Sequence, residues 1–522
     1  MKRFAALIDQ IAFTPGLNDK RAILARYFRE TPDPDRGFAA AALTGDLKLK
    51  TVTPSILRGL AGERIDAELF ALSYDYVGDL AETASLIWPG DGDEDIRLGE
   101  VVGALASASR SDAPRIVADH LDRLPQGVRY AFIKLALGGF RIGVSARLAK
   151  QALADAGGKD VAEIEEIWHG LTPPYRDLFA WLEGGPRPRV DAAAPFRPVM
   201  LATPFDAAER ARRAPADYAA EWKWDGIRVQ AVAERGDRRL YTRTGEDISA
   251  AFPDLVEAMA FDGALDGELM VKAGGGDGAF NDLQQRLNRK KPSAKLIAAS
   301  PAFLRAYDLL IDGAEDVRPL PFETRRARLA SFIEPLDDQR FDLSPNVAFA
   351  EWDELDALRS DPPHPAIEGL MLKRRDAAYA GGRPKGPWFK WKRDPYLIDA
   401  VLMYAQRGHG KRSSFYSDYT FGVWTPEGAL TPVGKAYFGF TDAELAEIDK
   451  FVRANTVERF GPVRSVAATP EHGLVFEVAF EGLNASKRHK SGVAMRFPRI
   501  SRLRWDKPPA EADNLEALRA LL

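Results

Sequence analysis

The sequence of 522 residues contains no cysteine. Disulfide bonds, cysteine-based zinc sites and thiol catalysis are therefore excluded. Only six histidines occur, and their spacing does not match that of metal-binding histidines. A bound metal ion would therefore have carboxylate ligands, which favours Mg²⁺ or Mn²⁺ over zinc.

Long apolar runs are absent as well. The N-terminal stretch 1–8 is followed by Asp9, too early for the apolar core of a secretion signal. A membrane-spanning helix would need about 20 apolar residues in a row. We therefore expect a cytoplasmic protein of bacterial type, with no membrane segment and with a length that suits about three domains.

A phosphate-binding loop of the Walker type is also missing. Residues 408–412 read Gly-His-Gly-Lys-Arg and lack both the required spacing and the terminal Ser or Thr. A nucleotide would therefore have to be held by side chains. This favours an activated lysine over the chemistry of kinases or motor ATPases.

The net charge of −4 argues against a simple nucleic-acid binder, which is usually basic overall. Positive charge is nevertheless concentrated near the C-terminus. The basic residues of this stretch are Lys487, Arg488, Lys490, Arg496, Arg499, Arg502, Arg504 and Lys507. Within that stretch they are opposed only by Asp506. A solvated face is the alternative, but the density of the cluster predicts contact with a polyanion.

Changes in composition divide the chain into four parts. Residues 1–182 show the apolar periodicity of helices, with Asn18 as an expected helix cap. Residues 183–204 are rich in Pro, Gly and Ala and form the expected linker. Strands and short helices alternate over 205–395, which predicts an α+β domain. Short alternating runs over 396–522 predict a small β-barrel of about five strands.

The most informative motif is the octapeptide 221–228, which reads Glu-Trp-Lys-Trp-Asp-Gly-Ile-Arg. Trp222 and Trp224 flank Lys223 and would partly remove its amine from water. Desolvation lowers the pKa of a lysine and leaves more of the reactive neutral amine at pH 7. Lys223 is therefore the candidate nucleophile.

If this motif is a strand, alternation places Glu221, Lys223 and Asp225 on one face and both tryptophans on the other. The Asp-Gly pair offers a turn that returns Arg228 toward the same site. The alternative is a structural role: a half-buried strand with a polar outer face and a tryptophan pair in the core.

Further carboxylates stand beside apolar runs. Asp266 and Glu268 fall on one face of a predicted strand, and Glu368 precedes the apolar run 370–372. Solvent-exposed edge strands would also explain these residues. Together with Asp225, Glu268 and Glu368 could hold a hard divalent cation.

The segment 388–392 reads Trp-Phe-Lys-Trp-Lys. In a strand, Trp388, Lys390 and Lys392 share one face. Two ammonium groups so close together repel each other, so a bound phosphate opposite them is the expected partner. The alternative is an exposed basic strand.

These motifs, in this order, resemble those of the ATP-dependent DNA ligases, members of the covalent nucleotidyltransferase superfamily. The bacterial type with an N-terminal helical DNA-binding domain is the most similar, and the resemblance extends over nearly the whole chain. It implies an all-α DNA-binding domain over 1–182 and, after the linker 183–204, an α+β adenylation domain over 205–395. An OB-fold β-barrel is implied over 396–522.

The resemblance implies roles for the nucleotide-binding residues. Lys223 matches the family lysine that becomes bound to AMP, and Glu268 matches a ribose-binding glutamate. Tyr307 matches an aromatic residue that stacks on adenine, and Glu368 with Glu268 would form the metal site. The implied catalytic residues are Lys223, Asp225, Lys390, Lys392, Arg504 and Lys507. The implied ATP or AMP contacts are Glu221, Arg228, Glu268, Tyr307, Lys390, Lys392, Arg504 and Lys507.

Other matches imply contacts with DNA. Arg243 matches the arginine that grips the 5′-phosphate of a nick. Phe280 and Phe497 resemble rings that press into the minor groove beside the nick. Arg496, next to Phe497, belongs to the same implied DNA surface, and Arg141 lies in a segment similar to one of the helical DNA-binding domain.

The resemblance therefore implies an enzyme that joins a 3′-hydroxyl and a 5′-phosphate at a nick in duplex DNA. The reaction would use ATP and Mg²⁺ or Mn²⁺ and pass through lysyl-AMP and adenylylated DNA. The resemblance also implies a monomer that works at the nucleoid, with an OB domain that reorients between steps.

Three rival functions are compatible with parts of the pattern. An RNA ligase or an mRNA-capping guanylyltransferase uses the same lysine chemistry, but the helical domain and the C-terminal motif 496–507 favour DNA. An NAD-dependent ligase is disfavoured because the cysteines of its zinc module are missing. A noncatalytic nucleic-acid scaffold would leave Lys223 with a purely structural role.

Overall fold

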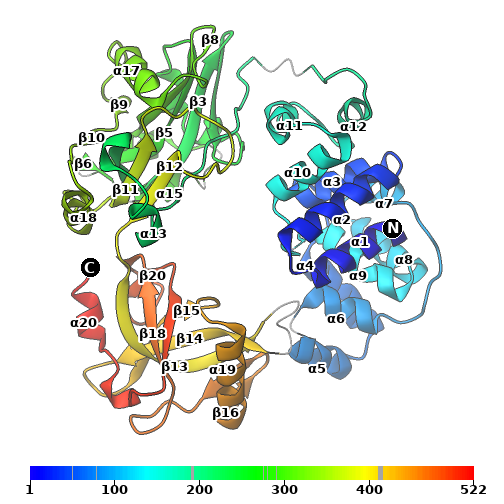
Figure 1. Cartoon of the computed structure of the whole chain (residues 1–522). Coiled ribbons are helices and arrows are strands. Elements are labelled where there is room, and N and C mark those ends of the chain that lie inside the picture. The colour runs from blue at the N-terminus through cyan, green and yellow to red at the C-terminus, as the bar shows by residue number, and fades with distance from the viewer. Residues whose placement is uncertain are drawn as a thin grey trace. The chain divides into compact units, whose positions relative to one another are not determined.

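The three-dimensional structure is a computed structural model (Figure 1). It describes residues 1–49, 51–77, 79–140, 142–189, 193–273, 276–278, 280–287, 289, 291–408 and 415–522. The chain divides into two compact units. The first comprises Met1–Gly158, Thr172–Gly185 and Pro395–Leu522, and the second comprises Lys159–Leu171 and Pro186–Asp394.

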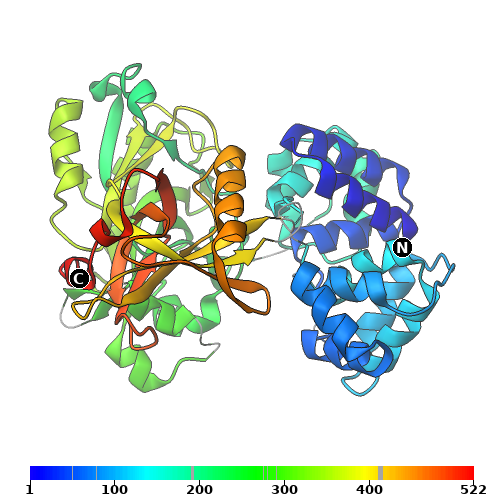
Figure 2. The same ribbon diagram turned by 90° about the horizontal axis from the view of Figure 1, so that it is seen from below.

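Helices make up the N-terminal part of the chain, as the sequence predicts. They are α1 (Lys2–Phe13), α2 (Leu17–Glu30), α3 (Asp35–Thr44), α4 (Pro54–Arg64), α5 (Ala67–Val77), α6 (Leu80–Ile87), α7 (Leu98–Ser107), α8 (Ala113–Arg123), α9 (Gln126–Leu137), α10 (Ala146–Gly157), α11 (Val161–Trp168) and α12 (Arg176–Leu182). Helix α2 packs along α10, and α6 packs along α9. Figure 2 shows the helical part of the chain in blue to cyan. Of the helices in the described residues, none is long and apolar enough to cross a membrane.

The expected cap of α2 is wrong. Helix α2 begins at Leu17 with Gly16 as its N-cap, so Asn18 lies inside the first turn. The Lys20 N–H donates to the Gly16 carbonyl and closes this turn two residues earlier than expected. Burial of Leu24 and Phe28 on one stripe confirms the helical periodicity.

Two sheets form the body of the second unit. One has the strand order β1 (Thr203–Pro204), β12 (Trp388–Lys392), β11 (Ile367–Arg374), β2 (Tyr218–Trp224) and β10 (Asn346–Val347). The other has the order β4 (Asp237–Thr242), β3 (Ile227–Glu234), β5 (Gly263–Ala273), β7 (Ala302–Asp312) and β8 (Glu315–Asp316), with β6 (Gly276–Asp277) beside β5 and β9 (Phe341–Leu343) beside β7. We call them the lysine sheet and the arginine sheet, because Lys223 lies on β2 and Arg228 on β3.

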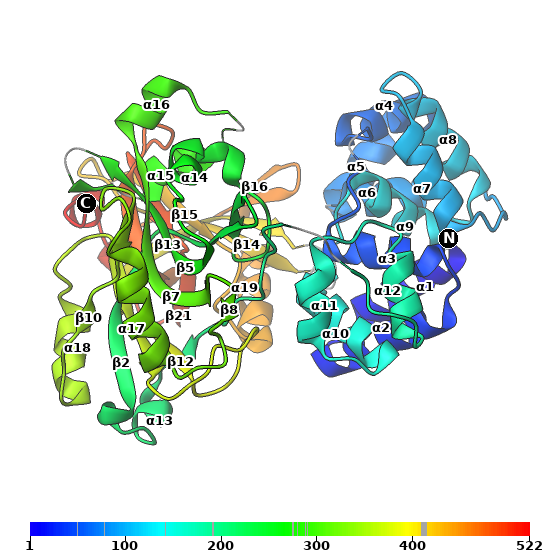
Figure 3. The same ribbon diagram turned by 90° about the horizontal axis from the view of Figure 1, so that it is seen from above.

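Helices cover both sheets. They are α13 (Ala207–Arg210), α14 (Pro253–Glu257), α15 (Phe280–Leu287), α16 (Ala294–Ala299), α17 (Phe322–Ile333) and α18 (Trp352–Ser360). Helix α17 packs on β7 (Figure 3) and on β9, and α18 packs on β11. The apolar face of the lysine sheet is aromatic: the Phe205 ring lies 4.9 Å from Trp352 and 5.1 Å from Trp391.

The chain crosses between the two sheets twice. Strand β2 ends at Trp224 and β3 begins at Ile227 in the other sheet. Gly226 fits this crossing because a Cβ there would lie 2.6 Å from the Leu269 carbonyl oxygen. The second crossing, from β9 to β10, passes through Ser344. These crossings bring the polar faces of both sheets to one site.

The C-terminal part is rich in β-structure. Its main sheet contains β13 (Tyr396–Arg407), β14 (Tyr416–Trp424), β15 (Leu430–Ala436), β16 (Thr456–Phe460), β17 (Val463–Val466), β18 (Val475–Phe480) and β21 (Arg499–Arg504), and a separate hairpin contains β19 (Gly482–Ala485) and β20 (Val493–Arg496). Helix α19 (Asp442–Ala454) buries Leu445, Ile448 and Val452 against this core, and α20 (Leu515–Arg519) follows β21.

The expectation of about five strands is too low. Strand β13 is long enough for two partners on one side, β18 along its first half and β17 along its second. Strand β16 then extends the sheet beyond β17. The β-rich, OB-like class is confirmed, and with it the predicted sequence of an all-α part, an α+β part and a β-rich part.

Candidate active site

Lys223 lies at the polar face of the lysine sheet, as the alternation predicts. Its ammonium forms an ion pair with the Glu368 carboxylate. The same carboxylate is 3.2 Å from the ammonium of Lys392. Burial raises the pKa of Glu368, but the charges of Lys223 and Lys392 outweigh burial and hold that pKa below its ordinary value. Glu368 is therefore an anion held between two cations.

Sheet register explains how residues so distant in sequence meet. Gly369 on β11 is the partner of Lys223 on one side and of Lys392 on the other. Gly369 has φ of +144°, and a Cβ there would lie 2.3 Å from the Trp391 carbonyl oxygen. This close backbone approach brings Glu368 next to both lysines.

The segment 388–392 is the strand β12, as predicted. Trp388 is buried, whereas Lys390 and Lys392 are only half-buried. Burial lowers the pKa of Lys390, and the nearby charges of Lys392 and Lys223 lower it further. Three ammonium groups thus lie near one another, an arrangement suited to a phosphate.

The two flanking tryptophans pack against apolar clusters. Trp224 packs with Met270, Phe303 and Ile367, and the Arg305 guanidinium lies 4.0 Å from its ring centre. The predicted division of the β2 strand into a polar face and an aromatic face is confirmed.

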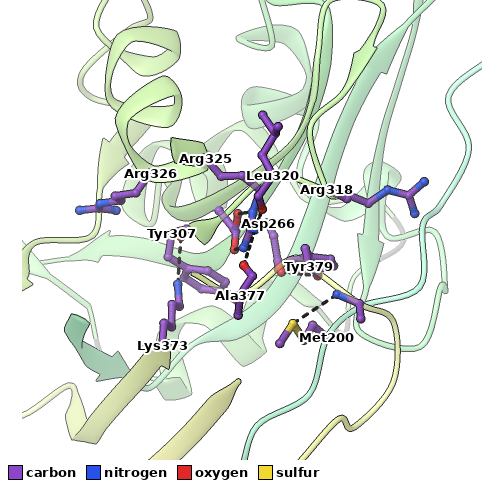
Figure 4. A network of polar contacts seen from close by, with 12 residues as sticks. Met200, Asp266, Tyr307, Arg318, Leu320, Arg325, Arg326, Lys373, Ala377 and Tyr379 are labelled. Atoms are coloured by element: carbon purple, nitrogen blue, oxygen red, sulfur yellow. Dashed lines mark hydrogen bonds and ion pairs between the residues drawn. The ribbon is translucent and has the colours of Figure 1, made fainter. Parts of the chain in front are cut away.

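Arg228 returns to the site from the arginine sheet. Its guanidinium donates to both oxygens of Asp266, at 3.0 and 2.6 Å. The Tyr379 hydroxyl donates to the same carboxylate at 2.7 Å (Figure 4). Asp266 is fully buried, so its charge is used to fix Arg228 and Tyr379 in place.

Glu268 lies opposite Arg228 in the register of β5 and β3. Burial raises the pKa of Glu268 to about 8, although Lys223 and Arg228 act to lower it and Glu368 acts to raise it. Glu268 and Glu368 are therefore both close enough to Lys223 to interact electrostatically with it.

A three-residue metal site does not form from these carboxylates. In the part of the chain that the structure describes, no three His, Cys, Asp or Glu side chains converge on a point that could hold a metal ion. The donor chemistry of Glu268 and Glu368 still fits Mg²⁺, which binds through one or two carboxylates together with substrate phosphates. The third expected ligand, Asp225, donates its backbone N–H to the Ala366 carbonyl at 2.7 Å.

Tyr307 and Glu221 are joined by Lys373, a residue that the sequence reasoning missed. The buried Lys373 ammonium donates to the Tyr307 carbonyl at 2.9 Å (Figure 4) and to Glu221 Oε2 at 3.0 Å. It lies 4.5 Å from the centre of the Tyr307 ring. The available signal was its place at the end of the apolar run 370–372, where a lysine is unexpected.

The predicted DNA-binding residues of this unit lie on or beside the arginine sheet, not on the lysine sheet. Arg243 is exposed in the turn after β4. Phe280 begins α15 and packs partly against the core of the arginine sheet. Arg141 lies outside the described residues.

The predicted C-terminal residues belong to the other unit. Asp399 on β13 accepts from Lys507 at 2.7 Å and from Arg504 at 3.1 Å. Phe497 is 60% exposed with φ of +51°, and the Arg496 guanidinium lies 5.4 Å from its ring. Sequence reasoning missed Asp399, which lies more than one hundred residues before its partners.

Two family models match the chain. The one described as "ATP dependent DNA ligase domain" matches residues 199–392, and the one described as "ATP dependent DNA ligase C terminal region" matches residues 412–507. A probable DNA ligase of Koribacter versatilis is 32% identical over 99% of this chain and 95% of its own length. The chain belongs to the ATP-dependent DNA ligase family.

Other relatives agree with this membership. A probable DNA ligase of Anaeromyxobacter dehalogenans is 30% identical over 100% of this chain and 99% of its own length. The solved structure named "Pmar-Lig_PreS3" is 14% identical over 96% of this chain and 99% of its own, with a TM-score of 0.62, which shows similarity of fold. The family models and the curated relatives therefore confirm the predicted family and the enzyme class, and membership of this family implies the use of ATP.

Proposed function

We propose that this ligase seals nicks in duplex DNA through a lysyl-AMP intermediate formed on Lys223. The observation that carries the proposal is the grouping of Lys223, Lys390, Lys392 and Glu368 on one sheet face. It supplies a nucleophile, two cations for a phosphate and an anion that can accept a proton.

The first transfer begins when Lys223 gives a proton to Glu368, the carboxylate with which it is paired. The neutral amine attacks the α-phosphorus of ATP. A nitrogen–phosphorus bond forms, and the bond to the pyrophosphate oxygen breaks. Lys390 and Lys392 counter the charge that develops on the transferring phosphoryl group.

Two further transfers complete the reaction. The 5′-phosphate of the nick, held by Arg243, attacks lysyl-AMP and takes the AMP. The adjacent 3′-hydroxyl then attacks this activated phosphate, the new phosphodiester forms, and AMP leaves. Glu268 and Glu368 would hold Mg²⁺, which neutralises phosphate charge when bound.

The remaining predicted residues complete the proposed site. Tyr307 stacks on the adenine, Glu268 also binds the ribose, and Arg504 with Lys507 orients the β,γ-phosphates. Phe280 and Phe497 contact the minor groove. Asp225, Glu221, Arg228, Arg496 and Arg141 keep the roles that the family resemblance implies.

We also propose an organisation for the whole enzyme. Residues 1–182 form the DNA-binding domain, 183–204 a linker, 205–395 the adenylation domain and 396–522 the OB domain. The OB domain reorients between the first and later transfers. The enzyme acts as a monomer on DNA in the bacterial cytoplasm.

Labelled nucleotides test this proposal directly. The full chain is incubated with α-labelled ATP, α-labelled GTP or labelled NAD, and the protein is examined for an adduct stable to alkali and labile to acid. We expect label from ATP, none with Lys223→Ala, and discharge of the adduct on nicked duplex DNA. Label from GTP alone, or an adduct on Lys223→Ala, would contradict the proposal.

A further inference from the structure

Close to Lys373, three buried polar atoms have no hydrogen-bond partner among the described residues. They are Glu221 Oε1, Arg326 Nη1 and Ser344 Oγ. Glu221 is 1% exposed and Ser344 is 0% exposed. Because an unpaired buried polar atom destabilises a fold, such atoms mark places where a ligand or a water supplies the partner.

Arg326 links these residues. It projects from α17, and its Nη1 lies 3.7 Å from Glu221 Oε1, an ion-pair distance too long for a hydrogen bond. Its other terminal nitrogen donates to the Ser344 carbonyl, which fixes the guanidinium. Ser344 lies at the crossing to β10, whose Asn346 is the register partner of Glu221. An unused donor and an unused acceptor therefore lie side by side.

This pair adjoins the aromatic ring expected to hold the base. Lys373 donates to the second oxygen of Glu221 and to the Tyr307 carbonyl, so one ammonium fixes both residues. Figure 4 shows Arg326 on α17, with Tyr307 and Lys373 nearby. A base stacked on Tyr307 would have one edge within reach of Glu221 and Arg326.

We propose that Arg326 is a specificity-determining residue that reads the nucleotide base together with Glu221. The inference rests on the proposed function, in which Tyr307 stacks on the base. Adenine carries an amino group beside a ring-nitrogen acceptor. Glu221 Oε1 accepts from the amino group, and Arg326 Nη1 donates to one of the ring nitrogens that flank it, N1 or N7.

The same pair rejects guanine. Guanine has a carbonyl acceptor where adenine has its amino donor. That oxygen would face the Glu221 carboxylate, so two acceptors would meet in a site closed to water. A buried group left unpaired by the wrong substrate gives strong discrimination, up to about 10⁴-fold.

Base analogues combined with variants test this inference. Initial rates of lysyl-adduct formation give kcat/KM for the full chain with ATP, 1-deaza-ATP, 7-deaza-ATP, purine riboside triphosphate and GTP. We expect kcat/KM of the wild type to be about 10-fold to 100-fold lower with one deaza analogue than with ATP, the range for a hydrogen bond to a charged group. Arg326→Met should lower kcat/KM with ATP by a similar factor. For this variant, replacing ATP by that analogue should lower kcat/KM no further, because the donor and the acceptor form one interaction.

Two further variants separate the loss of a hydrogen-bond donor from a general effect on folding. Arg326→Lys retains a charged donor and should restore part of the preference for ATP over the deaza analogue, even if Arg326→Met folds poorly. Arg328→Met is the matched control, because Arg328 lies on the same helix and pairs with Glu315 near the surface. It should keep the wild-type pattern with every analogue.

The outcomes separate the inference from the proposed function. Additive losses for Arg326→Met with both deaza analogues would overturn the reading role and mean that water, not the base, is the partner of these buried atoms. Labelling by ATP that still depends on Lys223 would then leave the proposed function intact. A chain that takes no label from any nucleotide contradicts the proposed function, and this inference with it.

Discussion

Glu368 is the residue that pairs with Lys223, the proposed nucleophile. Its carboxylate contacts Lys223 and Lys392 at once, so it neutralises part of a cluster of three ammonium groups. In the proposed mechanism it also accepts the proton of the Lys223 ammonium, with which it is paired. In the proposed mechanism, one side chain therefore serves both the charge balance of the site and the start of the reaction.

We expect Glu368→Gln to slow lysyl-AMP formation by about 10²-fold or more, because the amide cannot accept the proton. Single-turnover labelling with ATP measures this step. Glu315→Gln is the control, since Glu315 pairs with Arg328 near the surface. An unchanged rate for Glu368→Gln would show that Glu368 is not the base.

Glu268 gives the folded chain a pH dependence. Its pKa is about 8 in the fold against 4.5 for the free group, so the folded state binds the extra proton between these values. The stability that this group contributes is complete below about pH 4.5 and is lost as pH rises through 8. We therefore expect the unfolding temperature of Glu268→Gln, measured without metal or nucleotide, to fall less than that of the wild type between pH 5 and pH 9. An equal fall in the unfolding temperature of both proteins would contradict the raised pKa of Glu268.

At the scale of elements, buried ion pairs fix the strands and helices around the site. The Asp308 carboxylate on β7 accepts from Arg325 on α17 at 2.7 Å, and both side chains are fully buried. Arg325 also donates to the Leu320 and Ala377 carbonyls. A strand, a helix and the loop that leads to Tyr379 are thus held by one guanidinium (Figure 4).

Asp308→Asn should destabilise the chain by about 3–5 kcal/mol, because it leaves the Arg325 charge buried without a counter-ion. Denaturant unfolding followed by tryptophan fluorescence measures the loss. Asp376→Asn, which breaks the exposed pair with Arg374, is the control and should change stability by less than about 1 kcal/mol. Equal losses in the two variants would show that burial of the pair is unimportant.

At the scale of the whole molecule, charge is distributed unevenly. The chain carries a net charge of −4, yet the tip between β19 and β20 exposes Lys487, Arg488 and Lys490. Short-range contacts with phosphates matter more for DNA affinity than net charge, because salt screens distant charges. An acidic ligase can therefore still bind DNA through a local basic surface.

Replacing Lys487, Arg488 and Lys490 by alanine should reduce the salt dependence of DNA binding. If each contacts one phosphate, the slope of log K against log salt becomes less steep by about 2 to 3. Titration of nicked duplex at several salt concentrations measures it. Lys450→Ala, an exposed residue on α19, should leave the slope unchanged, and an unaltered slope in the triple variant would exclude the tip from the DNA surface.

The sequence by itself determined the local features of this protein. Alternation in 221–224 and 388–392 gave the correct strand faces, because side chains of a strand point to opposite sides whatever its neighbours are. The order of the motifs also identified the family, and the periodicities predicted the three structural classes along the chain.

Only the tertiary structure decided which charges meet. Asp266 shared a predicted face with Glu268, yet it binds Arg228, and Glu368 binds two lysines rather than joining a three-carboxylate group. Lys373 and Asp399 gave no local signal of their partners. Such pairings depend on sheet register and on chain crossings between sheets, which join residues more than one hundred positions apart, and local sequence rules do not fix that register.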